Sequence, residues 1–108
     1  MTEVEQLKDL ILQNQKLVDK QAKLLKLMTN EDFKDVILDG FCKDDLAEYL
    51  EVSVNTRIPE AARDNARGLA TAGAYLRNLF DVVQQQATMA QSDIEKAKET
   101  IVDIESGN

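Results

Sequence analysis

Residues 3–28 repeat their apolar positions with the period of an amphipathic helix. One heptad row is Leu10, Leu17 and Leu24, and a second is Val4, Ile11, Val18 and Leu25. Residues seven apart lie on one face of a helix, so the two rows merge into a single apolar stripe. The stripe is wider than a two-stranded coiled coil requires, which favours a helix that faces more than one neighbour.

A third row of the same stripe carries two polar residues, Asn14 and Gln21, between Leu7 and Met28. A buried Asn in such a row commonly fixes the register and the number of chains in a coiled coil. The other interpretation places both residues at the solvated edge of the stripe. The pattern favours neither interpretation.

The middle of the chain, residues 29–58, predicts two short helices. A capping residue in Thr29-Asn30 precedes acidic residues in the first turn, where the helix dipole favours them. Gly40 is the expected C-terminal stop of this first helix. Its expected apolar face is Phe33, Val36 and Ile37.

The second short helix is expected from about residue 43 or 44 to Val52, with Asp44 or Asp45 as its cap. The stretch Ser-Val-Asn-Thr at residues 53–56 ends it, and Pro59 follows where a first-turn proline is tolerated. Its expected inward-facing residues are Leu46, Tyr49 and Leu50.

Residues 59–105 predict one long helix, because two apolar rows persist in it for six heptads. The rows are Ala62, Leu69, Leu76, Val83, Ala90, Ala97 and Ile104, and Ala66, Gly73, Phe80, Ala87, Ile94 and Ile101. A continuous helix of this length would span roughly 69 Å at 1.5 Å per residue. We expect it either to bend near residues 84–88 or to project at one end and pack against another chain.

The first half of this long helix is rich in Ala and Gly, which let another helix approach closely. Gly68 and Gly73 each weaken an isolated helix by about 1 kcal/mol relative to Ala, so their use predicts close packing against the short helices of residues 31–52. The second half, residues 89–105, is then free to pair with residues 3–28, within the chain or between subunits.

These patterns predict an all-α protein with a single helical domain over residues 1–108. Its parts are a heptad helix in residues 1–28, short acidic helices in 29–58 and a long helix, either straight or bent, in 59–105. The predicted interface residues are Leu10, Ile11, Asn14, Leu17, Val18, Gln21, Leu24, Leu25, Ala90, Ile94, Ala97 and Ile101.

The net charge of −7 comes mainly from the middle of the chain, where residues 29–60 carry three basic and nine acidic residues. That balance argues against binding to nucleic acid or anionic membranes, which require clustered Lys and Arg. The acidic stretch is either a solvated face or a docking surface for a basic partner. No apolar run reaches the ~20 residues of a membrane span, and the N-terminus has no signal-peptide pattern.

Candidate chemistry is sparse, because the chain has no His and a single Cys, Cys42. His is the commonest general base and zinc ligand, and a lone Cys without a His partner is a poor nucleophile. We expect Cys42 to be a half-buried structural thiol in a chain made for a reducing cytosol. We expect no catalytic, cofactor-binding or metal-binding residue, and hence no enzyme.

Acidic residues at i, i+4 spacing offer one enzymatic alternative. They are Asp44, Asp45, Glu48, Glu60 and Asp64. The arrangement loosely resembles the Mg²⁺-binding carboxylates of all-helical nucleoside triphosphate pyrophosphohydrolases, although Asp44 and Asp45 stand where that motif has a Glu pair. A capping role explains these two residues, and the acids of residues 31–51 are the expected ion-pair partners of Arg63, Arg67 and Arg77.

Residues 24–41 resemble a group of small tailed-bacteriophage proteins. In that group a heptad helix leads into Asn-x-Asp-Phe, here residues 30–33, then an apolar turn and Gly followed by an aromatic residue, here Gly40 and Phe41. A polar stretch and a long Leu- and Ala-rich helix with an acidic end follow, and residues 65–105 fit that part. The resemblance implies a phage origin and a place among head or tail assembly proteins, and it carries over no catalytic residue.

The resulting hypothesis is a non-enzymatic virion or virion-assembly protein: a scaffold, a cement protein or an accessory component at the portal or tail. Its expected partners are further copies of itself and phage coat, portal or tail proteins, in the virion or in the host cytoplasm during assembly. The alternative is a phage-encoded inhibitor or regulator of a host protein that acts through an acidic surface. A packaging-motor small subunit is a third possibility, but it usually needs a basic DNA-binding module.

Overall fold

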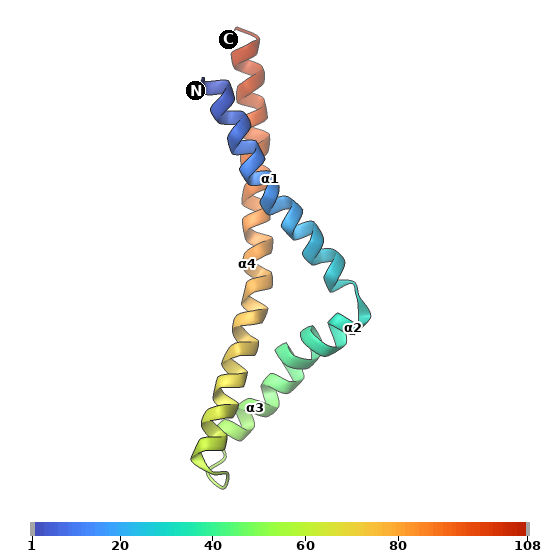
Figure 1. The fold of residues 1–108 in the computed structure, drawn as a ribbon, viewed down its shortest axis with the longest axis vertical. Coiled ribbons are helices and arrows are strands. Elements are labelled where there is room, and N and C mark those ends of the chain that lie inside the picture. Colours follow the sequence, from blue (N-terminus) through green and yellow to red (C-terminus); the bar gives the residue numbers. More distant parts are fainter. Residues whose placement is uncertain (1, 108) are drawn as a thin grey trace. The chain divides into compact units, whose positions relative to one another are not determined.

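The computed structural model describes residues 2–107 and shows them to be almost entirely helical (Figure 1). The elements are α1 (Glu3–Met28), α2 (Glu31–Phe33), the π-helix η1 (Lys34–Asp44), α3 (Asp45–Val54) and α4 (Glu60–Glu105). No strand occurs among these residues, so the all-α prediction is confirmed. Met1 and Asn108, the end residues of the predicted domain, lie outside the described part.

Polar side chains cap the start of α1 and the start of α2. Thr2 and Glu5 form a reciprocal capping box, in which Glu5 N donates to Thr2 Oγ1 at 3.1 Å and Thr2 N donates to Glu5 Oε2 at 3.2 Å. After α1 ends at Met28, the Asn30 side chain accepts a hydrogen bond of 2.9 Å from Phe33 N. The capping role predicted for Thr29-Asn30 is therefore confirmed at Asn30.

Helical backbone continues without a break from α2 through η1 to α3, so the prediction that Gly40 stops a helix is wrong. The residues around Gly40 form i→i−5 hydrogen bonds, and the Asp45 N–H donates to the Gly40 carbonyl oxygen. Glycine suits position 40 of this helix, because a Cβ there would lie only 2.7 Å from the Asp35 carbonyl oxygen.

Asp44 does not cap α3, contrary to expectation. Its φ and ψ of −68° and −48° are helical, and its side chain makes no capping hydrogen bond. A cap is needed only where a helix begins with free N–H groups, and here the π-helix already supplies the preceding turn. α3 continues to Val54, two residues beyond the predicted end at Val52, and Asn55 then leaves the helix with φ −84° and ψ 104°.

The long helix α4 begins directly after Pro59 and is hydrogen-bonded without interruption through residues 84–88. The Arg63 N–H donates to the Pro59 carbonyl oxygen at 3.0 Å, which places Pro59 at the start of the first turn. At the other end, Gly107 has a φ of 79° and its N–H donates to the Ile104 carbonyl oxygen at 3.2 Å. A glycine with positive φ is a common way to end a helix.

Contacts between Cα atoms divide the chain into two units, which share α4 between them. In unit 2, residues 25–81, the segment η1–α3 packs closely on the small residues of α4. The site of a Cβ on Gly73 is 2.9 Å from the Phe41 carbonyl oxygen and 3.3 Å from Leu46 Cδ1. The predicted close packing is thus confirmed at Gly73, whereas nothing lies within 4 Å of such a Cβ on Gly68.

The rest of the unit 2 core lies along the same face of α4. Ala66 and Ala70 are buried there, and the rings of Phe33 and Phe80 meet edge to face with centroids 6.0 Å apart. Aromatic pairs prefer this arrangement because the positive ring edge faces the negative ring face.

Unit 1 combines residues 2–24, which hold most of α1, with residues 82–107, which hold the second half of α4. The two helical segments run antiparallel (Figure 1). On α4 the inward residues follow a strict alternation of three- and four-residue steps, as a helix seam requires. They are Val83, Ala87, Ala90, Ile94 and Ala97, all buried, with Ile101 and Ile104 half-buried. Unlike α4, α1 has no buried residue.

Candidate functional site

The α4 members of the predicted interface lie inside unit 1. Ala90, Ile94 and Ala97 are 1%, 2% and 4% exposed, and Ile101 is half-buried. Of the two arrangements considered, pairing within the chain is therefore the one the structure adopts for residues 89–105. These side chains hold α1 against α4 and leave almost no surface for another molecule.

The α1 members are less covered, and they separate into two groups. Ile11, Asn14, Leu17, Val18, Gln21 and Leu24 are half-buried, whereas Leu10 and Leu25 are 40% and 48% exposed. The row Leu10, Leu17 and Leu24 is therefore only partly covered by the chain's own residues. It is the leading candidate for an apolar contact surface in unit 1.

Asn14 meets its hydrogen-bonding need within its own helix. Its Nδ2 donates to the Leu10 carbonyl oxygen at 3.0 Å, one turn earlier. This bond lets the amide lie half-buried without a partner on another helix, which favours the solvated-edge interpretation of this residue.

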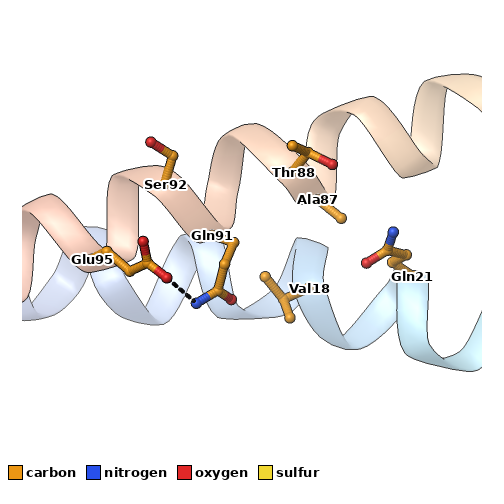
Figure 2. Close-up of a pocket in the computed structure, with 7 residues that line it drawn as sticks. All are labelled: Val18, Gln21, Ala87, Thr88, Gln91, Ser92 and Glu95. Atoms are coloured by element: carbon orange, nitrogen blue, oxygen red, sulfur yellow. Dashed lines mark hydrogen bonds between the residues drawn. The ribbon is translucent and has the colours of Figure 1, made fainter.

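A groove of about 360 Å³ opens between α1 and α4 within unit 1 (Figure 2). Its lining residues are Val18, Gln21, Ala87, Thr88, Gln91, Ser92 and Glu95. Gln91 Nε2 donates to Glu95 Oε1 at 3.4 Å, so two of the polar lining residues are hydrogen-bonded to each other. The groove offers amides, hydroxyls and one carboxylate around a small apolar floor, with no cation among the lining residues.

The arginines of α4 do not pair with the acids of residues 31–51, contrary to expectation. Arg67 Nη1 lies 2.8 Å from Asp64 Oδ1 one turn earlier, and Arg67 Nη2 donates to the Ser53 carbonyl oxygen at 3.4 Å. Arg63 Nε donates to the Ile58 carbonyl oxygen at 3.1 Å. Within residues 2–107 the Arg67–Asp64 contact is the only ion pair, so no acidic residue of η1 or α3 forms one there.

Three apolar side chains of η1 and α3 are exposed to solvent. Val36 is 65% exposed, Leu50 50% and Val54 76%. The predictions that Val36 and Leu50 face inward are wrong, and the π-helix explains the first. About one more residue per turn than in an α-helix carries Val36 away from the face that holds Phe33 and Ile37.

Cys42 is fully buried, rather than half-buried as expected, and has no partner thiol in the chain. Burial raises the pKa of the thiol, and the nearby Arg77 charge lowers it by less. A raised pKa keeps the sulfur in its poorly nucleophilic neutral form. The side chain therefore acts as part of the packing between η1 and α4.

The acids considered as a Mg²⁺ site do not come together. Within residues 2–107 no group of three or more Cys, Asp or Glu side chains is arranged to hold a metal ion. In the same part of the chain, no helix has both the length and the apolar character needed to cross a bilayer.

Sequence reasoning misplaced Val36 because it assumed ordinary helical spacing through residues 34–44. The signal was present in the apolar positions Phe33, Ile37, Cys42 and Leu46. Their steps of four, five and four residues fit a π-helix of about 4.4 residues per turn better than an α-helix.

No protein-family model, curated protein or solved structure matches the chain.

Proposed function

We propose that this chain is a non-enzymatic bacteriophage virion or virion-assembly protein that acts by self-association and by docking on other phage structural proteins. It serves as a scaffold, a cement protein or an accessory component at the portal or tail. The phage assignment rests on the resemblance of residues 24–41 and 65–105 to small tailed-phage proteins. The binding role rests on the surface of α1.

The observation that supports the binding role is that α1 has 26 residues and apolar rows of period seven, yet none of its residues is fully buried within the chain. An amphipathic helix gains most of its stability from packing its apolar face, so a row that is only partly covered favours a further partner. The row Leu10, Leu17 and Leu24 has the spacing that such a partner helix would use.

The experiment compares the mass of the wild-type chain with that of Leu10→Glu by light scattering over a range of concentrations. Self-association through this row predicts a wild-type mass above that of one chain and a lower mass for Leu10→Glu. Gln15→Glu is the control, since it adds the same charge at an exposed position of the same helix. A wild-type chain that stays monomeric at high concentration would contradict the proposed self-association.

The second candidate is a phage inhibitor of a host protein, and the unpaired acidic residues of η1 and α3 favour it. Carboxylates that form no ion pair among residues 2–107 are available to a basic partner. The two functions differ in where the protein resides. Finding the chain in purified, nuclease-treated phage particles supports the virion role, and its absence from them supports the inhibitor.

A further inference from the structure

We infer that α1 of one copy docks on α3 of a second copy through three complementary charges, so that self-association proceeds head to tail. The inference rests on the self-association proposed above and adds a charged contact to the apolar row Leu10, Leu17 and Leu24. Its partner is a second copy of this chain, because each copy carries both halves of the contact.

The basic half is the outer face of α1. Lys16, Lys20 and Lys23 follow one another at i, i+4 and i+7, which puts them on one side of the helix. Leu12, one turn before them on the same side, is 64% exposed. All three lysines are exposed, and none has a carboxylate within ion-pair distance among residues 2–107.

The acidic half is the outer face of α3 with the last residue of η1. Asp44, Glu48 and Glu51 repeat the same i, i+4, i+7 spacing and are all exposed. Val54, three residues after Glu51, is an exposed apolar side chain next to this face. The C-terminus of α3 adds negative partial charge from its free carbonyl groups, which favours cations there.

Equal spacing on the two faces permits three simultaneous ion pairs when the helices run parallel: Lys16 with Asp44, Lys20 with Glu48, and Lys23 with Glu51. A single exposed pair contributes only ~0–1 kcal/mol, so the contact depends on the three pairs forming together as one network. Charges of opposite sign also set the register and suppress the wrong pairing of like faces.

The chain cannot make this contact with itself. Only Thr29 and Asn30 separate α1 from the next helical stretch, so folding one onto the other would make them antiparallel. At 1.5 Å per residue, Lys23 would then fall about 20 Å short of Glu51. The parallel pairing therefore requires a second copy, and because its two faces differ, it produces open chains or closed rings of several copies.

The test uses full-length chains with reversed charges. The first variant carries Lys16→Glu, Lys20→Glu and Lys23→Glu; the second carries Asp44→Lys, Glu48→Lys and Glu51→Lys. Mass is measured by light scattering at about 50 mM and 500 mM salt, since screening weakens exposed pairs at high salt. The average mass of the wild-type protein should exceed twice the monomer mass at low salt and fall at high salt. Each variant alone should have a lower average mass than the low-salt wild type at both salt concentrations.

Mixing the two variants should restore the larger mass at low salt, because the acidic α3 of the first meets the basic α1 of the second. This recovery also shows that both variants fold. The matched control carries Lys8→Glu, Lys96→Glu and Lys98→Glu, which change the net charge equally at exposed positions elsewhere and should leave the wild-type mass intact.

Three results would overturn the inference: a wild-type oligomer insensitive to salt, one unaffected by the first variant, or a mixture that does not recover. In each of these cases the oligomer persists, so the proposed self-association stands. A wild-type chain that is monomeric under all conditions overturns both. Salt-dependent compaction at constant monomer mass would indicate contact within one chain and would also overturn the inference.

Discussion

Two glycines five residues apart in α4 have opposite surroundings, and this difference can be measured. A Cβ on Gly73 would lie 2.9 Å from the Phe41 carbonyl oxygen, a backbone atom that cannot easily move away. A Cβ on Gly68 would meet nothing within 4 Å. At the open position, replacing Gly by Ala stabilises a helix by about 1 kcal/mol. At the closed position, η1 must first move away from α4.

We therefore expect Gly68→Ala to raise the melting temperature by about 4 °C and Gly73→Ala to lower it by at least as much. Thermal unfolding followed by circular dichroism gives both values, with each variant serving as the control for the other. Equal shifts of the same sign would show that η1 does not rest on Gly73.

The buried thiol of Cys42 makes a second prediction, on pH dependence. Because burial raises its pKa in the folded chain, the thiol's contribution to stability is fully present below 9.0, the ordinary pKa of a cysteine thiol. That contribution is lost as pH rises through the higher folded-state pKa. Denaturant unfolding between pH 7 and 10.5 should show a steeper decline for wild type than for Cys42→Ala, and parallel curves would contradict it.

At the scale of elements, η1 is the least ordinary part of the chain. Long π-helices are rare, since their hydrogen bonds are less favourable than those of an α-helix, and they persist only where packing supports them. Here the support comes from Phe41, Cys42 and Leu46, which the wider turn brings to the α4 side together. Gly40 removes the Cβ that would collide with the Asp35 carbonyl oxygen.

Gly40→Ala should therefore destabilise the protein despite the higher helix propensity of Ala. The expected loss is of the order of 1–3 kcal/mol, the usual cost of an overpacked contact. Denaturant unfolding measures it, and Gly68→Ala, expected to stabilise, controls for the propensity gain. A stabilised Gly40→Ala would mean that residues 34–44 can adopt α-helical geometry at no cost.

The bounds of α1 and α4 could be predicted from sequence because their heptad rows are long and their ends carry clear signals at Asn30 and Pro59. The middle stretch could not be predicted as well. Gly40 is a common stop signal, and only the contact with Asp35 shows why the helix continues through it. The position of Val36 depended on that missing turn geometry.

At the scale of the whole molecule, the sequence predicted that residues 89–105 would pair with α1 and that the short helices would cover Gly73. It did not predict which charges stay unpaired, because Arg63 and Arg67 turn to backbone carbonyl oxygens instead of the acids of η1 and α3. Hydrogen bonds of that kind depend on where a loop end happens to lie. As a result, the acidic residues on α3 form no ion pair within residues 2–107.

The full burial of Cys42 also has a practical consequence, since reagents that attach probes to thiols need an exposed sulfur. The wild-type chain is a nearly silent background for site-directed labelling, and its native cysteine need not be removed first. A spin label at Lys20→Cys in one sample and Glu51→Cys in another could report distances in the assembled state while the packing around η1 stays intact.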